Sequence, residues 1–226
     1  MALMTPEGKG ENMDIHQITY REKLAQHLIK ALTKRRLEAS YAPTAVQARE
    51  EILAMIPSGA TISRGGSMSV VETGLWEALR HKPGIELIDP FQSGLAPEAA
   101  QELRRQSLLV DFYITSSNAL TMDGRLVNLD GSGNRVAAMC FGPKKVILVV
   151  GLNKVTPDLE SAMARVKHHA APINCIRLKR ATPCAETGLC IDCKSPERIC
   201  YMWSIIEGHM LENRIHVKLV GEDLGY

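Results

Sequence analysis

Polar residues that could bind and transform a small ligand are crowded into one stretch of the chain, residues 115–154. Its glycines can adopt positive φ or let a ligand approach the main chain closely. Its side chains supply hydrogen-bond acceptors, donors and one fixed cation. Asp123-Gly124, between apolar runs, is also a strong hairpin signal. We therefore predict a hairpin at this dipeptide and a ligand site made by Asn118, Asp130, Gly131, Asn134 and Arg135.

A second candidate loop is Gly65-Gly66-Ser67, between an expected strand at residues 60–63 and a helix that begins near Met68. Free backbone N–H groups and the helix dipole favour an anion at such a position. The same residues would also make an ordinary strand-to-helix turn in which a serine caps the helix. Neither the dinucleotide-binding fingerprint nor a Walker loop is present. The loop therefore predicts backbone donors for a phosphate or carboxylate.

Three charged residues receive candidate roles. Arg135 would pair with a carboxylate or phosphate of the ligand. Asp130 or Glu72 would act as a general acid or base. Glu72 lies one helical turn beyond the glycine loop, where the sequence favours a carboxylate in the first turn of a helix that faces solvent over an acid or base in the cleft.

Cysteine spacing is the second chemical signal. Four thiols in one turn-rich segment of a reduced protein favour metal ligation over disulfides, and thiolates hold either an iron–sulfur cluster or a tetrahedral zinc. The spacing matches neither a zinc ribbon nor a ferredoxin, so the metal stays open between the two. Cys200 precedes an apolar run and could simply be buried, and Cys140 and Cys175 are expected to be small core residues. The predicted metal ligands are Cys184, Cys190, Cys193 and Cys200.

Hydrophobic periodicity predicts how these residues are positioned. Helices and strands alternate along the chain, which predicts an α/β fold with an open, mainly parallel sheet flanked by helices and an N-terminal helical segment. In such sheets ligands bind beyond the carboxyl ends of the strands, so the two polar loops should converge there. The expected helices are 15–39, 44–55, 97–106 and 157–166, and the further expected strands are 85–88, 109–115, 145–151, buried on both faces, and 214–220, half-exposed.

Composition limits the functional classes. The chain has 226 residues, a net charge of +2 and 4% aromatic residues, and no basic stripe interleaved with aromatics, which argues against nucleic-acid binding. The polar start lacks the apolar core of a signal peptide, and no run is long enough to span a bilayer, so we expect a cytoplasmic protein. Residues 1–14 are predicted to be a flexible tail, residues 15–226 one domain with a cysteine-rich loop at 184–200, and a homodimer is plausible.

Three segments resemble the lactate-utilisation (LUD) domain family. They read RGGSMSVVETGL at residues 64–75, SNALTMDGRLVNLDGSGNRVAAMCFGPKKVILVVGLNK at 117–154 and HVKLVGEDLGY at 216–226. The resemblance implies a fold akin to the sugar-phosphate isomerase and CoA-transferase group. It also implies a part in the oxidation of lactate to pyruvate, alongside iron–sulfur partner proteins. The cysteine cluster is not needed by the shortest members and resembles the cysteine-bearing, stand-alone ones.

These observations lead to one working expectation and two alternatives. The chain is expected to bind a small anionic metabolite, an organic acid or a phosphorylated compound, and to take part in lactate utilisation with an iron–sulfur centre of its own. One alternative is an isomerase or transferase that acts on sugar phosphates or CoA thioesters. The other is a non-catalytic subunit whose cysteines hold structural zinc.

Overall fold

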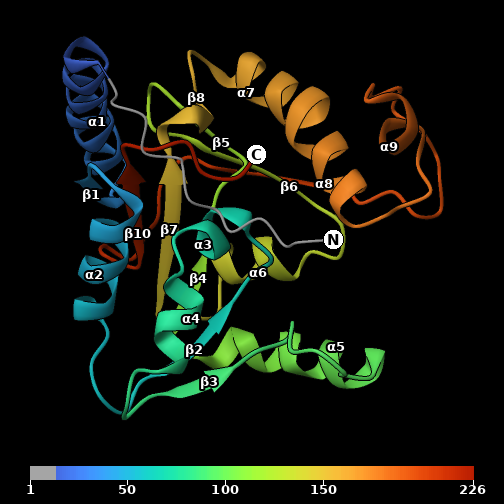
Figure 1. The fold of residues 1–226 in the computed structure, drawn as a ribbon, viewed down its shortest axis with the longest axis horizontal. Helices are drawn as coiled ribbons and strands as arrows, with labels where there is room; N and C mark the ends of the chain where they lie inside the picture. The colour runs from blue at the N-terminus through green and yellow to red at the C-terminus, as the bar shows by residue number, and fades with distance from the viewer. Residues whose placement is uncertain (1–13) are drawn as a thin grey trace, which may run out of the picture.

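The computed structural model describes residues 14–226, so the predicted N-terminal tail lies outside the described residues except for Asp14. Within this range ten strands form two sheets (Figure 1). The larger sheet has the order β1-β10-β7-β4-β2-β3 and all its pairs are parallel. Helices flank it, which confirms the predicted α/β class. Its strands are β1 (Glu38–Ala42), β2 (Thr61–Arg64), β3 (Glu86–Ile88), β4 (Phe112–Thr115), β7 (Lys145–Gly151) and β10 (Ile215–Val220).

The smaller sheet has the order β8-β5-β6-β9 and carries the predicted hairpin. Strands β5 and β6 pair antiparallel, and Gly124 in the turn between them has φ +89°. A Cβ on Gly124 would also lie 2.9 Å from the backbone carbon of Ala31, so only glycine fits this turn against the first helix. The strands are β5 (Ala119–Thr121), β6 (Leu126–Asp130), β8 (Val155–Thr156) and β9 (Met202–Ile206).

The helices cover both sheets. Helices α7 and α8 lie beside the smaller sheet, at the opposite end of the molecule from β3 and α5 (Figure 1). None of the helices within residues 14–226 combines the length and apolar character needed to cross a bilayer. The α-helices are α1 (Ile15–Lys34), α2 (Ala45–Met55), α3 (Met68–Glu72), α4 (Leu75–Arg80), α5 (Pro97–Gln106), α6 (Asn134–Cys140), α7 (Leu159–Arg165), α8 (Ala171–Arg177) and α9 (Pro183–Thr187), with a π-helical turn at Val166–Ala170 and 3-10 turns at Ser107–Leu109 and Leu152–Lys154.

Strand β7 explains how the core is layered. Because side chains alternate across a strand, Val146 and Leu148 pack with α1, α6 and the hairpin, whereas Ile147 and Val149 pack with α2, α3 and α4. All four are fully buried. The prediction of a strand buried on both faces is therefore confirmed.

The first helix is shorter than the sequence predicted. It ends at Lys34, and residues 38–42 form edge strand β1 instead of a further helical turn. Arg36 adopts φ +61°; its N–H donates to the carbonyl of Thr33, and the N–H of Leu37 donates to that of Leu32. This is a Schellman ending with arginine where glycine is usual, so the sequence carries no glycine to mark it.

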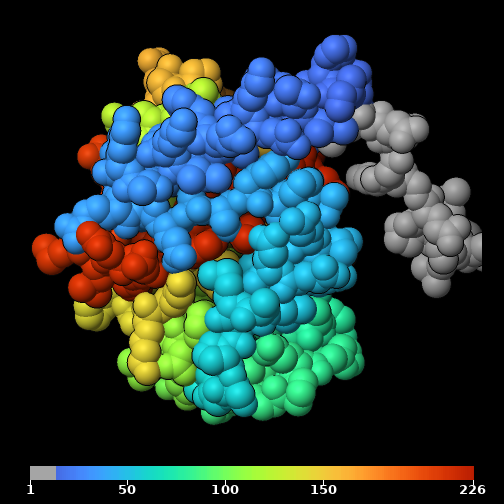
Figure 2. Space-filling view, turned by 90° about the vertical axis from the view of Figure 1, so that its left-hand side faces the viewer, coloured from blue at the N-terminus to red at the C-terminus, as the bar shows by residue number. Residues whose placement is uncertain are grey.

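Strand β10 was predicted to be half-exposed, and this is wrong. Every residue of Ile215–Val220 is buried, because β10 is an interior strand between β1 and β7 and both of its faces are covered, one by α1 and the other by α2. The polar positions that created the alternation have partners, since His216 contacts Ser40 and the Nζ of Lys218 lies 2.6 Å from a carboxylate oxygen of Glu51 on α2. Figure 2 shows the blue and cyan atoms of α1 and α2 covering this side of the molecule.

Replacing Glu51 with Gln should lower the free energy of unfolding by about 1 to 3 kcal/mol at neutral pH, because the buried ammonium of Lys218 loses its counter-charge. The Lys218 hydrogen bond holds the pKa of Glu51 below its usual 4.5. A carboxyl with a lowered folded pKa stabilises the fold above its unfolded pKa, and this contribution is lost as the pH falls. Urea unfolding should therefore show the difference between the two proteins shrinking below pH 4.5. Glu50→Gln, at an exposed neighbouring position, is the control, and equal stability of both variants at neutral pH would contradict the prediction.

Candidate functional site

A cleft of about 520 Å³ lies beyond the carboxyl ends of β2, β4 and β7. In the sheet, β3 lies on one side of β2, and the later strands β4, β7 and β10 lie in that order on the other side of β2. The cleft therefore lies at the point where the strand order reverses, which is where open parallel sheets bind ligands. Loops after these strands line it, together with the end of β6, helix α8 and residues 196–201.

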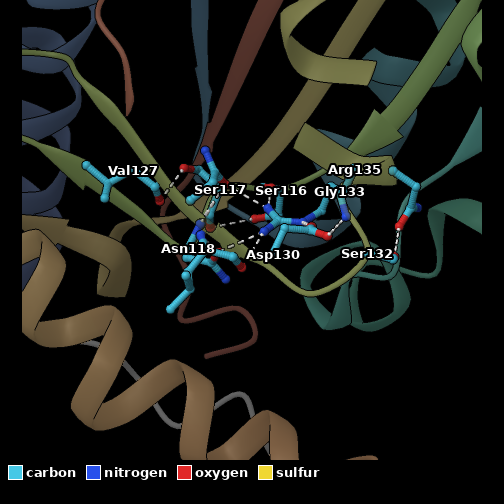
Figure 3. Close-up of polar contacts among 11 residues, drawn as sticks. Ser116, Ser117, Asn118, Val127, Asp130, Ser132, Gly133 and Arg135 are labelled. Carbon is cyan, nitrogen blue, oxygen red and sulfur yellow. Dashed lines mark hydrogen bonds and ion pairs between the residues drawn. The ribbon is translucent and has the colours of Figure 1, made fainter. Parts of the chain in front are cut away.

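Arg135 organises the floor of the cleft. It is 8% exposed, and each of its five guanidinium N–H groups has an acceptor (Figure 3). The network joins the loop after β4 to strand β6. The acceptors are the carboxylate of Asp130 at 3.1 Å, the side-chain oxygens of Asn118 at 2.8 Å and Asn128 at 2.7 Å, and the carbonyl oxygens of Ser116 and Leu129 at 3.1 Å each.

This saturation changes the role of Arg135 relative to the sequence prediction. A guanidinium has five N–H donors, so none is left to pair with a carboxylate or phosphate of a ligand. Asp130 is similarly engaged, because one carboxylate oxygen accepts from Arg135 and the other accepts from the backbone N–H of Gly133 at 2.8 Å. Arg135 and Asp130 line the cleft, but their contacts assign them to holding its loops in place.

Lys154 is the unexpected member of the site. It follows β7, lines the cleft and is 4% exposed. Its Nζ donates to the hydroxyls of Ser69 at 2.7 Å and Ser116 at 3.0 Å. Among residues 14–226 no carboxylate lies within ion-pair distance of it. Burial, followed by the positive charges of Arg165 and Arg135, lowers the pKa of this lysine to about 7.

The rest of the cleft is strongly basic. Both of its carboxylates have partners within the protein, since Asp130 pairs with Arg135 and Glu197 accepts from the N–H of Ala181 at 3.0 Å. Arg177, the last residue of α8, and Arg180, three residues beyond it, are exposed and form no ion pair within residues 14–226. Arg177 donates to the side-chain oxygen of Asn174 at 2.8 and 3.0 Å. The basic side chains that line the cleft are Arg104, Arg135, Lys154, Arg177, Arg180 and Arg198.

A second cavity, of about 10 Å³, is bordered by five thiols. The four predicted ligands are joined there by Cys175 on α8, which is 2% exposed and therefore buried as the sequence predicted. Within the described chain no three His, Cys, Asp or Glu side chains are placed to hold a single metal ion. Cys140, also expected to be buried, is exposed. The thiols that border the cavity are Cys175, Cys184, Cys190, Cys193 and Cys200.

Two cations border this cysteine cavity. The Nζ of Lys167 lies 2.6 Å from Asp192, whose hydrogen bond raises the pKa of the lysine, with a smaller contribution from Cys200. Arg198 donates to the carbonyl oxygens of Cys193 and Cys200 and also lines the large cleft. The two cavities thus share Arg198.

Comparison with known proteins places this chain in a family. A model of the LUD domain matches residues 25–220. The chain belongs to the LUD domain family. A solved structure of a DUF162 family protein from Deinococcus radiodurans is similar, with a TM-score of 0.51 at 10% identity over 88% of this chain and 98% of that chain.

Two more solved structures are more distant. They are eIF2B delta from Chaetomium thermophilum, with a TM-score of 0.35 at 18% identity over 66% of this chain and 54% of that one, and eIF2B beta from the same organism, with a TM-score of 0.36 at 19% identity over 52% and 44%. Neither bears on the function of the LUD domain. No curated protein was found to match the chain.

The LUD domain brings most of the predicted ligand residues together. Gly65 lies behind the cleft, where a Cβ would meet the hydroxyls of Thr115 at 2.7 Å and Tyr113 at 2.9 Å, so packing requires this glycine. Ser67 caps α3, accepting from the N–H of Val70 at 3.3 Å. The predicted residues that line the cleft are Gly66, Ser67, Asn118, Asp130, Gly131, Asn134 and Arg135.

Glu72 lies outside the cleft lining of the LUD domain. It is exposed, and its carboxylate accepts from the backbone N–H of Gly225 at 2.7 Å. Ser69 and Asn153 also bind this segment through Leu224 and Gly225. Glu72 therefore fixes residues 224–226 beside Lys154, and an acid–base role for it is not supported by these contacts.

Sequence reasoning missed Lys154, Cys175 and the basic end of α8. Lys154 follows the apolar strand at residues 145–151, and its position after a central strand was the available signal. Arg177 and Arg180 come from a helix far along the chain, and nothing in their local pattern places them opposite the glycine loop.

Proposed function

We propose that the cleft of this LUD domain binds a small organic acid or phosphorylated metabolite and that the protein takes part in lactate-type oxidation. The observation that carries the proposal is the charge of the cleft, where five arginines and Lys154 meet two acidic side chains that already accept hydrogen bonds within the protein. Arginine guanidinium groups bind carboxylates and phosphates through paired hydrogen bonds. Because Arg135 is saturated, the contact falls to Arg104, Arg177 and Arg180, which line the cleft and form no ion pair among the described residues; of these, we propose that Arg177 and Arg180 bind the ligand.

Anion binding can be tested by the melting temperature in the presence of L-lactate, pyruvate, inorganic phosphate and sugar phosphates, since a ligand of the native state stabilises it. Arg177→Gln and Arg180→Gln should each weaken binding about tenfold or more, as expected for a lost charged hydrogen bond. Lys179→Gln removes the same charge from a neighbouring exposed residue outside the cleft lining and should leave binding nearly unchanged. If no anion shifts the melting temperature of the parent protein, the proposal fails.

We propose that the cysteine cavity holds an iron–sulfur cluster, with zinc as the alternative; at about 10 Å³ the cavity would have to widen to admit a cluster. Zinc needs four sulfurs at about 2.3 Å from one ion, whereas the cysteines of a cluster bind different irons and stay further apart. The thiols border one small cavity without converging on a single point. Lys167 and Arg198 would balance the negative charge of thiolate ligands. A bound cluster would supply one-electron transfer, and an iron–sulfur protein is the redox partner that such chemistry would need.

The same basic cleft also suits a second reaction class, isomerisation or group transfer on phosphorylated sugars or CoA thioesters. Phosphate is a better match for several arginines than a single carboxylate is. Stabilisation by sugar phosphates or acyl-CoA, with none by lactate or pyruvate, would favour this class. Stoichiometric zinc without turnover would instead favour a non-catalytic subunit.

A further inference from the structure

Lys154 differs from an ordinary buried lysine because no residue in the described part of the chain, 14–226, supplies it with a counter-charge. Lys218 is buried to a similar degree, and its Nζ lies 2.6 Å from Glu51. The Nζ of Lys154 instead contacts two hydroxyls. Burying an unpaired ammonium is costly, so the surroundings of Lys154 favour the neutral amine.

Lys154 donates two hydrogen bonds, which is the number that a neutral amine can donate. The hydroxyl of Ser69 donates to the carbonyl of Leu224 at 3.1 Å, and that of Ser116 donates to the carbonyl of Ser117 at 3.2 Å. Each hydroxyl therefore accepts from Lys154. A neutral amine has two N–H donors, and both are used, which leaves its lone pair free. An ammonium would have a third N–H without an acceptor among the described residues.

The charges near this amine come from three helices. Arg135 on α6 and Arg165 on α7 oppose protonation, and Glu72 on α3 favours it more weakly. With a pKa of about 7, roughly half of Lys154 is neutral at neutral pH, about a thousandfold more than for a lysine with an ordinary pKa. The lone pair belongs to a residue that lines a basic cleft.

We propose that Lys154 is the nucleophile of this cleft and forms an imine with the carbonyl carbon of a small 2-oxo acid. The proposal rests on the anion-binding function proposed above and names the substrate class of that site. The amine lone pair attacks the carbonyl carbon, the carbonyl oxygen leaves as water with the two amine hydrogens, and a C=N bond replaces the C=O bond. The substrate carboxylate would face the arginines of the cleft. Ser69 and Ser116 are positioning residues, because they orient the amine.

The test is reductive trapping of the full chain with pyruvate and cyanoborohydride at neutral pH, followed by intact mass and peptide mapping. One reduced pyruvate per chain on Lys154 is expected, at least about tenfold above the labelling of exposed Lys144 and of buried, paired Lys218. Lys154→Met should abolish the adduct. Because the parent protein contains its own control lysines, the site is identified even if the variant fails to fold. Equal labelling of all lysines, or no label on Lys154, would overturn the proposal.

Lactate separates failure of the imine from failure of the anion site, because it carries the same carboxylate without a carbonyl. It should raise the melting temperature and slow trapping by pyruvate without forming an adduct. If lactate and pyruvate both stabilise the protein and no adduct forms, the imine is overturned and the anion site stands. If neither stabilises it and no adduct forms, both are overturned. Equal trapping of acetaldehyde, which lacks the acid group, would overturn the 2-oxo acid as the substrate class.

Discussion

Arg135→Met should lower the free energy of unfolding by about 3 to 5 kcal/mol, the usual cost of breaking a buried ion pair from one side. Asp130, which is 8% exposed, would lose its charged partner. The side-chain oxygens of Asn118 and Asn128 would also lose a donor each. Urea unfolding measures the effect, and Arg105→Met, at an exposed helix position, should change stability by less than about 0.5 kcal/mol.

Arg135→Lys distinguishes a residue that holds loops from one that binds the ligand. Lysine keeps the charge but has three N–H donors that cannot span the five acceptors. If Arg135 holds the loops, this variant is also destabilised. Lactate binding that weakens while stability stays at the parent value would contradict the structural role and restore direct ligand contact.

The sequence predicts the central architecture well because the signal there is local. The apolar run at residues 145–151 and the hairpin glycine at 124 each specify their own conformation. The rule that ligands bind beyond the carboxyl ends of parallel strands then places the loops at Ser67 and Asn118 on one cleft. Local pattern and simple topology suffice for these features.

The sequence fails where tertiary contacts decide. The polar residues His216 and Lys218 produce the alternating pattern that is typical of a half-exposed strand. Their burial is explained only by their partners, Glu38 for His216 and Glu51 for Lys218. Likewise, Arg135 has the right chemistry for an anion, and only the count of its acceptors shows that it is already satisfied. Residue type indicates which chemistry is available, and packing decides whether the group is free to perform it.

Protein purified without oxygen should contain iron and sulfide and absorb broadly in the visible range, and Cys190→Ser or Cys193→Ser should remove most of the iron. Each substitution takes one thiolate from the cysteine cavity, and an iron–sulfur cluster needs its full set of ligands. Cys140→Ser changes a cysteine outside the cavity and should leave the iron content unchanged. Stoichiometric zinc without sulfide would contradict the iron–sulfur assignment.

Five thiols border a cavity for which four ligands were predicted, so the fifth can be identified by counting iron in two further variants. Cys175 is 2% exposed on helix α8, whereas Cys200 lies in the segment that leads into β9. If Cys200 is a ligand as predicted, Cys200→Ser loses iron and Cys175→Ser keeps it. The reverse result would place a ligand on α8. Since α8 also carries Arg177, a cluster bound there would be attached directly to a helix that lines the anion cleft.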